Sequence, residues 1–524
     1  MANRIRIPEL LFAAVLISLG PQVASAGDYF VDCTARDAGS GSRSAPWGSL
    51  AAVNRWRAFA PGDHLRLRAG TRCAGPLAPQ GQGARGRPIV LTSYGKGARP
   101  IIAAGKAPAA LTLTDQSWWT LSGLHLVGGA RWGVHITAVS GLVRGITLRN
   151  LVVERVTGGA LDSKDTGLVV IAPEPRDARN SAGARFDQVL VDGVLARSTT
   201  MWAGILVGTG SPRSNWFLDE AKRSTRVTVR NSVVHHVYGD GIILFVVNDG
   251  LLDHNVAHHS GIQPTKTIGT PNAIWTWACD RCVVQYNEAY ENASPGIDGG
   301  AFDIDFHSKD SVVQYNYGHD NAAYCVAVFA AEEKVTINST IRYNICSNNG
   351  TKAVKQRTEI EISAIEGSSI DGLQIYGNSF YTRNKLIHVS DGALKGARPR
   401  TFQNNIVYST SDLEQDGLED FESGHNVWYL PRGKVSHREA GSLYADPLFV
   451  GEARGAMRSA GDFRLRDRSP AIGAGAGIPD SGGRDHFGGR VPRCGRLDIG
   501  AVESARRRAI RARESPGATT DVLH

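Results

Sequence analysis

The stretch SVVQYNYGHDN at residues 311–321 decides the fold, because close variants of it recur along the chain. Each variant has a short run rich in β-branched residues, then an asparagine, then a polar turn. The other copies are VTVRNSVVHH (227–236), GLLDHNVAHHS (250–260), CVVQYNEAYEN (282–292), STIRYNICSNN (339–349), LQIYGNSFYTR (373–383) and RTFQNNIVYST (400–410). A unit that returns every 24 to 34 residues predicts a solenoid of stacked supersecondary units.

The content of the repeat indicates which solenoid it is. The runs are rich in Val, Ile, Thr and Tyr and lack the 3.6-residue apolar period of helical repeats, so we expect coils of parallel β-strands. Asparagine suits a corner of such a coil, because it tolerates left-handed backbone and its amide can bond to the next coil. A β-propeller would instead repeat at about 40 residues. The recurring asparagines are Asn231, Asn255, Asn287, Asn316, Asn344, Asn378 and Asn404.

Segments near both ends of the chain complete a resemblance. Residues 28–73 begin DYFVDC and end GTRC, and the C-terminal part contains YADPLFVG (444–451), GDFRLRDRSPAIGAG (461–475) and DIGAVE (498–503). With the repeat, they make the chain resemble secreted right-handed parallel β-helix proteins of the pectin-lyase-like superfamily. This implies an all-β solenoid with an N-terminal helical cap and a C-terminal capping segment. It does not fix the reaction, because the superfamily hosts hydrolases, lyases, epimerases, esterases and non-catalytic adhesins.

We expect one elongated domain behind an export signal. Residues 1–26 combine a basic start, an apolar run and a small-residue cleavage site, which predicts a signal peptide and a secreted or periplasmic protein. Residues 27–110 should form the N-terminal cap and first coils, 111–430 the β-helix core and 431–503 the C-terminal coils and cap, since a solenoid must cover its ends. Residues 504–524 are expected to be a basic, disordered tail.

The net charge of the chain limits the kinds of binding partner that we expect. The net charge is +8, but five arginines within residues 505–513 belong to the predicted tail. A basic balance is compatible with an acidic polysaccharide, whereas predicted export argues against nucleic acid. No later stretch has the ~18 to 20 apolar residues of a membrane span. We expect a monomer that binds a polysaccharide or oligosaccharide, with no membrane insertion.

Seven cysteines in an exported chain make disulfides plausible and leave one over. The preferred pairs are Cys33 with Cys73 and Cys325 with Cys346. The Cys279 to Cys282 element is open to three interpretations, namely a tight disulfide, a redox pair or half a zinc site. We interpret it as structural, because no second CxxC or nearby histidine pair supports zinc.

A second strand precedes the asparagine in each coil, and alternation assigns its faces. Phe302, Ile304 and Phe306 should point into the core, so Asp303 and Asp305 should point outward. By the same logic, the outward positions of neighbouring coils hold Trp275, Trp277, Glu359 and Glu361, while Ile360 and Ile362 face inward.

The outward acids predict the chemistry. Alternate residues of a strand lie ~6.6 Å apart and parallel strands ~4.8 Å apart, so Asp303 and Asp305 should be near 6.6 Å by Cα, with Glu361 roughly 10 Å away. Such spacings suit the carboxyl pair of a glycosidase. Repulsion should raise the pKa of one aspartate and make it the proton donor. We predict a glycoside hydrolase with Asp303, Asp305 and Glu361 as catalytic residues and no cofactor.

Substrate contacts are predicted around the acids. Trp275 and Trp277 offer flat surfaces for sugar rings, unless the loop at residues 261–272 covers them. The other predicted substrate-binding residues are His307, Glu359, Asp298 and Glu333. A second interpretation, as turn or surface residues, applies to Asp240, Asp298, Glu332 and Glu333. We interpret the corner histidines as coil-stacking residues, namely His235, His236, His258, His259 and His319.

Two alternatives stay open. A polysaccharide lyase or epimerase of an acidic, uronate polysaccharide would use Lys309 or an arginine as base, with calcium held by Asp298, Asp303 and Asp305. A non-catalytic surface protein would only bind glycans. The NTD, DD and RIK set of polygalacturonases is not found in register, which argues against that particular activity.

Overall fold

The computed structural model of the chain describes residues 26–504 except 36–38, 57, 175–182, 209–221, 265–267, 353–356, 411–416, 432–437, 453–456 and 493–494. Apart from Ala26 and Ser504, the predicted signal peptide and the predicted basic tail lie outside the described residues. Among those residues, no helix is long and apolar enough to cross a membrane.

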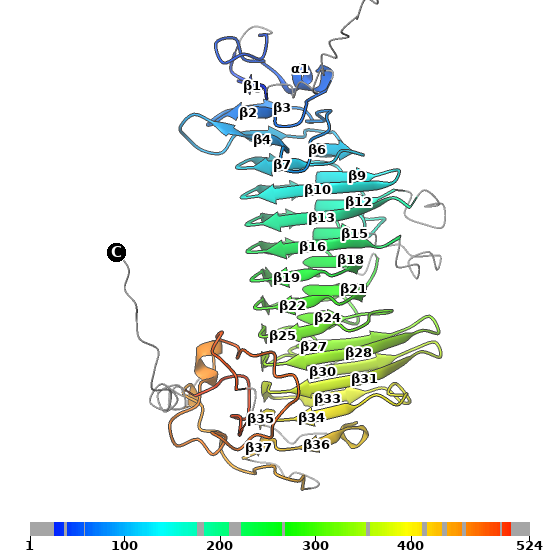
Figure 1. Cartoon of the computed structure of the whole chain (residues 1–524), viewed down its shortest axis with the longest axis vertical. Helices are drawn as coiled ribbons and strands as arrows, with labels where there is room; N and C mark the ends of the chain where they lie inside the picture. Colours follow the sequence, from blue (N-terminus) through cyan, green and yellow to red (C-terminus); the bar gives the residue numbers. More distant parts are fainter. Residues whose placement is uncertain are drawn as a thin grey trace, which may run out of the picture.

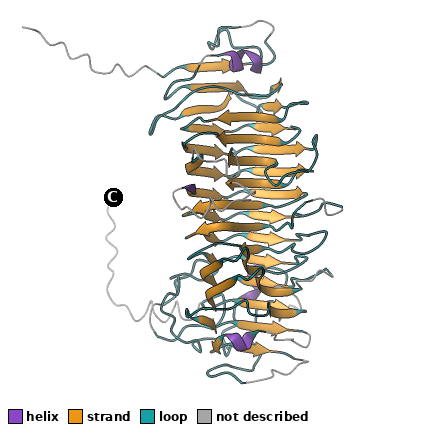
Figure 2. Cartoon of the chain, turned by 90° about the vertical axis from the view of Figure 1, so that its right-hand side faces the viewer, coloured by secondary structure: helices purple, strands orange, loops and turns teal. Residues whose placement is uncertain are grey.

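The chain winds into stacked coils, and strands of successive coils pair in parallel (Figure 1, Figure 2). The pairing forms a 24-stranded sheet and a 13-stranded sheet, and the larger sheet consists of two ladders. Ladder 1 contains β6 (Ala109–Thr114), β9 (Trp132–Ala138), β12 (Gly167–Pro173), β15 (Ala203–Gly208), β18 (Ile242–Asn248), β21 (Ile274–Asp280), β24 (Phe302–Ile304), β27 (Val326–Ala330), β30 (Thr358–Ala364) and β33 (Lys385–Val389).

Ladder 2 contains β1 (Asp28–Val31), β2 (His64–Arg68), β4 (Ile89–Tyr94), β7 (Trp119–Ser122), β10 (Leu142–Arg149), β13 (Arg185–Asp192), β16 (Ser224–Arg230), β19 (Leu251–Asp253), β22 (Val283–Gln285), β25 (Val312–Gln314), β28 (Val335–Arg342), β31 (Ser369–Tyr376), β34 (Arg400–Gln403) and β36 (Glu422–Gly424).

Ladder 3, the smaller sheet, contains β3 (Arg72–Ala74), β5 (Ile101–Ala103), β8 (His125–Val127), β11 (Val152–Val156), β14 (Leu195–Thr199), β17 (Val233–Val237), β20 (Val256–His258), β23 (Glu288–Tyr290), β26 (Tyr317–His319), β29 (Ile345–Ser347), β32 (Ser379–Thr382), β35 (Ile406–Ser409) and β37 (Val427–Tyr429).

Because the strands pair in this register, the apolar positions of successive sequence repeats stack on one another and form the core. Val284, Val313 and Ile341 stack in one inward column of ladder 2 and are at most 1% exposed. Their neighbours on each strand point outward, because side chains alternate along a strand. Each buried aliphatic side chain contributes about 1.5–3 kcal/mol relative to exposure, and the columns repeat this gain in every coil.

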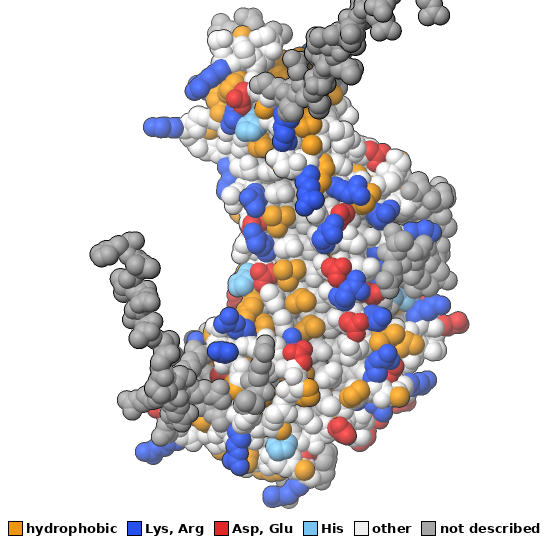
Figure 3. All heavy atoms as spheres, viewed as in Figure 1, with side chains coloured by type: hydrophobic (Ala, Val, Ile, Leu, Met, Phe, Trp, Pro, Cys, Tyr) orange, Lys and Arg blue, Asp and Glu red, His pale blue; other side chains and the backbone are white. Residues whose placement is uncertain are grey.

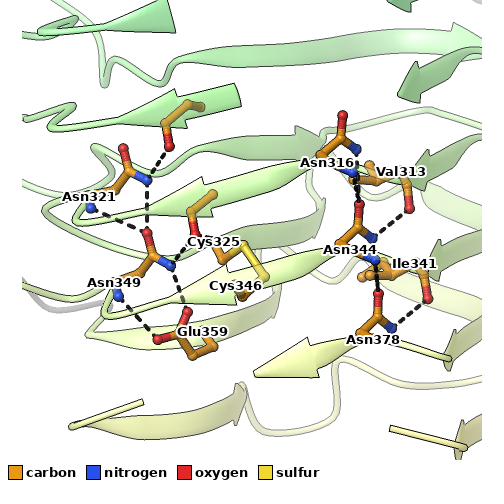
Figure 4. The surroundings of a disulfide bond; sticks show 12 residues. Val313, Asn316, Asn321, Cys325, Ile341, Asn344, Cys346, Asn349, Glu359 and Asn378 are labelled. Atoms are coloured by element: carbon orange, nitrogen blue, oxygen red, sulfur yellow. Dashed lines mark hydrogen bonds between the residues drawn. A yellow bond between two sulfur atoms is a disulfide. The ribbon is translucent and has the colours of Figure 1, made fainter. Parts of the chain in front are cut away.

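A column of asparagines runs inside the corner between ladders 2 and 3 (Figure 4). Asn316 is typical: its Nδ2 donates to Val284 O (2.9 Å) and to Asn344 Oδ1 (3.0 Å), while its Oδ1 accepts from the backbone N of Asn287 (2.9 Å). Every such amide satisfies backbone groups that the turn would otherwise leave buried and unpaired. The column comprises Asn255, Asn287, Asn316, Asn344, Asn378, Asn405 and Asn426.

Two predicted members of this column are wrong. Asn231 and Asn404 have φ values of 50° and 55° and occupy the left-handed position just before the corner. The column positions next to them belong to Ser232, whose backbone N donates to Asn255, and to Asn405. We predicted that one asparagine would both adopt the left-handed backbone and bond to the next coil. In the structure two successive residues do this: the first has the left-handed backbone, and the second bonds to the next coil.

The two preferred disulfides are confirmed, since Cys33 is bonded to Cys73 and Cys325 to Cys346. Of the three interpretations left open for Cys279 and Cys282, the tight disulfide is the one present. The Cys279 pair joins a strand of ladder 1 to the turn before ladder 2, as a structural element.

The short helix α1 (Leu50–Arg55) lies at the N-terminal end of the stack (Figure 1), and two 3-10 turns, η4 (Leu418–Asp420) and η6 (Ala460–Phe463), belong to the C-terminal part. The chain is a right-handed parallel β-helix, as predicted. The domain boundaries stay a prediction.

Candidate active site

A cavity of about 1020 Å³ lies on the outer face of ladder 1, beside β18 to β33. This is the face to which strand alternation assigned the two acids. Its lining residues are Lys164, Phe245, Thr270, Asn272, Trp275, Trp277, Ile297, Asp298, Asp303, Asp305, Phe306, Phe329, Ala330, Glu332, Arg357, Thr358, Glu361, Ser363, Ile365, Arg383, Asn384, Lys385, His388 and Ser390.

Strand register explains why the acids meet there. Trp275, Asp303, Ala327, Glu361 and His388 pair in succession and form one column along ladder 1. Two strand spacings separate Asp303 from Glu361, or roughly 10 Å by Cα. The intervening Ala327 is fully buried and packs in a small apolar cluster with Tyr324 and Phe329. The prediction that Asp303 and Glu361 share the outer face is confirmed.

The predicted inward direction of Phe306 is wrong. β24 ends at Ile304, and although the backbone N of Asp305 still donates to Thr276 O (2.8 Å), the chain then turns, with His307 at a φ of 61°. Alternation fails once the strand ends, so Phe306 lines the cavity instead of the core.

Three carboxylates gather around this turn. Asp303 Oδ2 accepts a hydrogen bond from Asn272 Nδ2 (3.2 Å), and Asp298 Oδ1 accepts one from the Tyr324 hydroxyl (3.3 Å). Burial raises the pKa of Asp303 well above its usual range, and the charges of Asp305 and Asp298 raise it further. Burial also raises the pKa of Asp305 to about 8. The coupled pair therefore retains a proton at neutral pH, as a general acid must.

Asn272 and two glycines hold this cluster in place. Asn272 Oδ1 accepts from the backbone N of Gly299 (3.1 Å) and of Gly300 (2.8 Å), which anchors the loop that carries Asp298. A Cβ on Gly300 would lie 2.1 Å from the Tyr324 ring, so only glycine lets this tyrosine pack here. Sequence reasoning missed Asn272 and Tyr324, because both act from turns that no period marks.

Asp240 lies behind the cluster and does not line the cavity. It is fully buried, its carboxylate accepts from Trp202 Nε1 and from the backbone N of Asn272 (2.8 Å), and burial raises its pKa to about 6. It is therefore neither a surface residue nor a substrate contact, but supports the loop that contains Asn272.

The two tryptophans point outward as predicted but are largely covered. Trp275 is 3% exposed and Trp277 5%, and both pack with Trp202 and Phe245 in an apolar cluster outside the solenoid core. Lys164 Nζ lies 5.2 Å from the Trp202 ring and 5.7 Å from the Trp275 ring. Both tryptophans line the cavity, but little of either side chain is exposed to a ligand.

Glu361 has one occupied oxygen and one unoccupied oxygen. Its Oε1 accepts from Ser363 Oγ (2.7 Å) and pairs with His388 Nδ1 at 2.9 Å. Its Oε2 has no hydrogen-bond partner among the described residues, although Glu361 is only 1% exposed. His388 could have been found in the sequence by extending the register one coil further.

Of the remaining predicted substrate contacts, His307 and Glu333 do not line the cavity. His307 is buried, with its ring 5.5 Å from the Trp277 ring and its Nε2 3.0 Å from Glu332 Oε2. Glu333 lies in an exposed turn with a φ of 56°. Glu332, which was assigned to the surface, is the acid of this turn that lines the cavity.

The predicted outward position of Glu359 is wrong. Glu359 is fully buried at the end of a second asparagine column, where its Oε2 accepts from Asn349 Nδ2 (2.7 Å) and its Oε1 from the backbone N of Asn349 (3.1 Å) (Figure 4). Asn349 in turn pairs with Asn321. Burial raises the pKa of Glu359 to about 8. The residue belongs to the scaffold.

The corner histidines form stacks, which confirms their structural interpretation. His235 stacks on His258 at 4.9 Å and His236 on His259 at 4.7 Å between ring centroids. The column continues to Tyr290, which stacks on His319 at 5.0 Å. These rings lie along ladder 3, away from the cavity lining.

Of the residues of the lyase alternative, the calcium set Asp298, Asp303 and Asp305 lines the cavity, whereas the base Lys309 does not. Lys309 is exposed, and its backbone forms isolated β-bridges with Asp280 and Ile337. Within the described residues, one group of three potential ligand atoms lies within 4.8 Å, at Cys325, Cys346 and Glu359, and its two sulfurs form a disulfide.

Four buried polar atoms that line the cavity have no hydrogen-bond partner in the described structure. Two can donate, Trp275 Nε1 and Thr358 Oγ1, and two can accept, Asp303 Oδ1 and Glu361 Oε2. Buried polar atoms normally find a partner, because an unpaired one costs about 1–3 kcal/mol. A ligand rich in hydroxyl groups can pair with both kinds.

The fold and the site define a parallel β-helix protein with a carboxylate-lined cavity on one ladder. A family model described as "Right handed beta helix region" matches residues 220–363. The chain has the right-handed parallel β-helix fold.

Particular proteins are similar to this chain. A lacto-N-biosidase of Bifidobacterium longum subsp. longum is 24% identical, over 89% of this chain and 36% of that protein. The chain thus spans about a third of the length of this curated relative. The crystal structure of the GH136 lacto-N-biosidase from Eubacterium ramulus, as a selenomethionine derivative, is similar with a TM-score of 0.60 and 24% identity, over 74% of this chain and 68% of that chain. The native form of the same protein gives a TM-score of 0.58.

Proposed function

We propose that the chain is a glycoside hydrolase that cleaves a glycan bound in the cavity on ladder 1. The observation that carries the proposal is the cluster of Asp298, Asp303 and Asp305, in which burial keeps a proton on a carboxyl group at neutral pH. Unpaired polar atoms along the same cavity match the hydroxyl groups of a sugar. The likeness to lacto-N-biosidases supports the same reaction class.

In this proposal Asp305 is the proton donor. Asp303 is 1% exposed and held by Asn272, whereas Asp305 is partly exposed at the cavity. Asp305 gives its proton to the glycosidic oxygen as the bond to the sugar carbon breaks, and burial together with the charge of Asp298 maintains the raised pKa of Asp305.

Two carboxylates remain for the second catalytic role. Asp298 lies close enough for its charge to raise the pKa of Asp305, which suits the short separation of a retaining enzyme. Glu361 lies two strands from Asp303, which suits the longer separation of an inverting enzyme. The anomer of the first product, read by proton NMR, distinguishes Asp298 from Glu361.

The experiment that tests the function is incubation with a panel of oligosaccharides and polysaccharides that includes a lacto-N-biosidase substrate. New reducing ends without absorbance near 230 nm are expected. An unsaturated, ultraviolet-absorbing product would instead identify a lyase, and binding without any product would identify a non-catalytic glycan-binding protein.

We also propose that the protein works outside the cytoplasm, as a secreted or periplasmic enzyme. The three disulfides support this location, since they persist in oxidising compartments. Mass spectrometry of the exported protein, with a mature N-terminus near Gly27, tests it.

A further inference from the structure

An apolar strip lies beside the proposed proton donor on the outer face of ladder 1. Asp305 follows the last residue of β24, and the register of that strand puts it between Trp277 of β21 and Phe329 of β27. Phe306 is the next residue, and Ile365 directly follows β30. These four apolar residues all line the cavity, and we call them the apolar strip.

Large apolar side chains are exposed at few places in the described part of the chain. The exposed ones are Trp56, Val139, Ile297, Val335 and Ile365. Two of these five, Ile297 and Ile365, line the cavity, and Ile365 is 52% exposed. On the face shown in Figure 3, apolar side chains lie singly or in small groups among charged ones. An exposed apolar side chain at a cavity stabilises a complex when an apolar ligand removes it from water.

The polar groups next to the apolar strip already have partners. Ser363 Oγ donates to Glu361 Oε1 (2.7 Å). Ser390 Oγ accepts from a backbone N–H of β30 (3.0 Å), and Glu332 Oε2 pairs with His307 Nε2 at 3.0 Å. A sugar hydroxyl would have to replace one of these bonds, whereas an apolar group can cover the strip without breaking any.

The four lining atoms that have no hydrogen-bond partner in the described structure lie on the other side of Asp305. Three of them, on Trp275, Asp303 and Glu361, belong to the outward column two residues before that of Asp305. The fourth, on Thr358, is at the start of β30. A proton donor acts on the oxygen that joins the two halves of its substrate, so one half lies on each side of Asp305. The polar side suits the sugar, and the apolar strip is left for the leaving group.

We propose that the apolar strip binds an apolar aglycone, so that the enzyme releases its sugar from an apolar alcohol. The inference rests on the proposed function and deepens it, because it names the class of leaving group. The proton of Asp305 goes to the glycosidic oxygen, and the bond between that oxygen and the sugar carbon breaks. The aglycone leaves as a neutral alcohol, and water supplies the hydroxyl group of the released sugar.

The test measures kcat/KM for the methyl, butyl, octyl and phenylethyl glycosides of the glycone that the oligosaccharide panel shows to be released. All four aglycones leave as simple alcohols, so their apolar area differs more than their leaving-group chemistry. We expect kcat/KM to rise at least about tenfold from the methyl to the octyl glycoside, because each buried methylene group favours binding. The octyl and phenylethyl members show whether an aliphatic or an aromatic aglycone is recognised.

Ile365→Ser should lower kcat/KM for the octyl glycoside about fivefold more than for the methyl glycoside, because the serine offers less apolar surface. Val139→Ser is the matched control and should keep the full rise. Val139 directly follows β9 as Ile365 follows β30, and it is 43% exposed but outside the cavity lining.

Two results would overturn the inference and leave the proposed function standing. The first is an equal kcat/KM for all four glycosides, and the second is hydrolysis of free oligosaccharides alone. Absence of hydrolysis across the whole panel would overturn both the inference and the proposed function.

Discussion

The asparagine corner and the cavity on ladder 1 treat buried polar groups in opposite ways. In the corner, Asn316 satisfies one neighbour above, one below and a backbone carbonyl. In the cavity, Asp303 Oδ1 and Glu361 Oε2 are just as buried but remain unpaired in the described structure. Both regions use the same coil, so the difference is not one of fold.

The comparison shows which buried polar groups lower the free energy of unfolding of this protein. A paired amide column stabilises every coil that contains it, whereas a buried carboxylate oxygen without a partner lowers the stability of the folded state, and a ligand can supply that partner. Sites for chemistry are expected where buried polar groups remain unpaired and pKa values are shifted.

The largest expected effect is on turnover. Asp305→Asn should lower kcat by about 10²- to 10⁴-fold, because the amide has no proton to give. Kinetics on the substrate found in the panel, with thermal melting beside them, measure this. Asp391→Asn, an exposed aspartate outside the cavity lining, should keep full activity. An active Asp305→Asn enzyme would refute the assignment of the donor.

The next effect is on stability in the corner. Asn316→Ala should lower the free energy of unfolding by about 3 kcal/mol, because Val284 O and the backbone N and Nδ2 of Asn287 lose their bonds to the amide. Urea denaturation measures it. Asn231→Gly, which keeps the left-handed backbone at an exposed position, should cost less than about 1 kcal/mol. Equal losses would remove the distinction between the two asparagine positions.

Stability should also depend on pH in a direction set by the buried acids. Burial raises the pKa of Asp305 and of Glu359 to about 8. The folded protein thus holds protons that the unfolded chain releases near pH 4, and the free energy of unfolding falls as the pH rises from about 4 toward 8. Melting temperatures between pH 5 and 8.5 should show this decline.

A variant can attribute part of that slope. Asp303→Asn keeps an oxygen for Asn272 and cannot ionise, so its melting temperature should fall less between pH 5 and 8.5 than that of the wild type. Asp249→Asn, at an exposed position, should keep the wild-type slope. A parallel decline in both variants would show that Asp303 ionises freely in the folded protein.

The smallest effect is expected on the outer surface. Arg281 and Asp249 form an ion pair at 2.7 Å, but their side chains are 47% and 49% exposed. Water and salt screen such a pair, so Arg281→Ala should change the free energy of unfolding by less than about 1 kcal/mol. A loss comparable to that of Asn316→Ala would place surface ion pairs among the main stabilising contacts.

Particular elements show why prediction from the sequence worked in some places. The period-2 pattern of FDI at residues 302–304 placed Asp303 outside correctly, since a strand permits two directions only. The same rule failed at Phe306 and Glu359, because the first follows the end of its strand and the second bonds into the corner column. Lys164, Asn272 and Tyr324 come from turns, where no period predicts direction.

The sequence by itself determined the coil and the direction of strand residues such as Asp303, because these depend on local alternation and on a repeat that imposes its own register. The tertiary structure alone decided which acids line the cavity and which of their oxygens lack a hydrogen-bond partner among the described residues. These features depend on the turns between strands and on residues several coils apart in the stack. The pKa shifts of the acids follow from their burial, which the sequence of a single strand does not reveal.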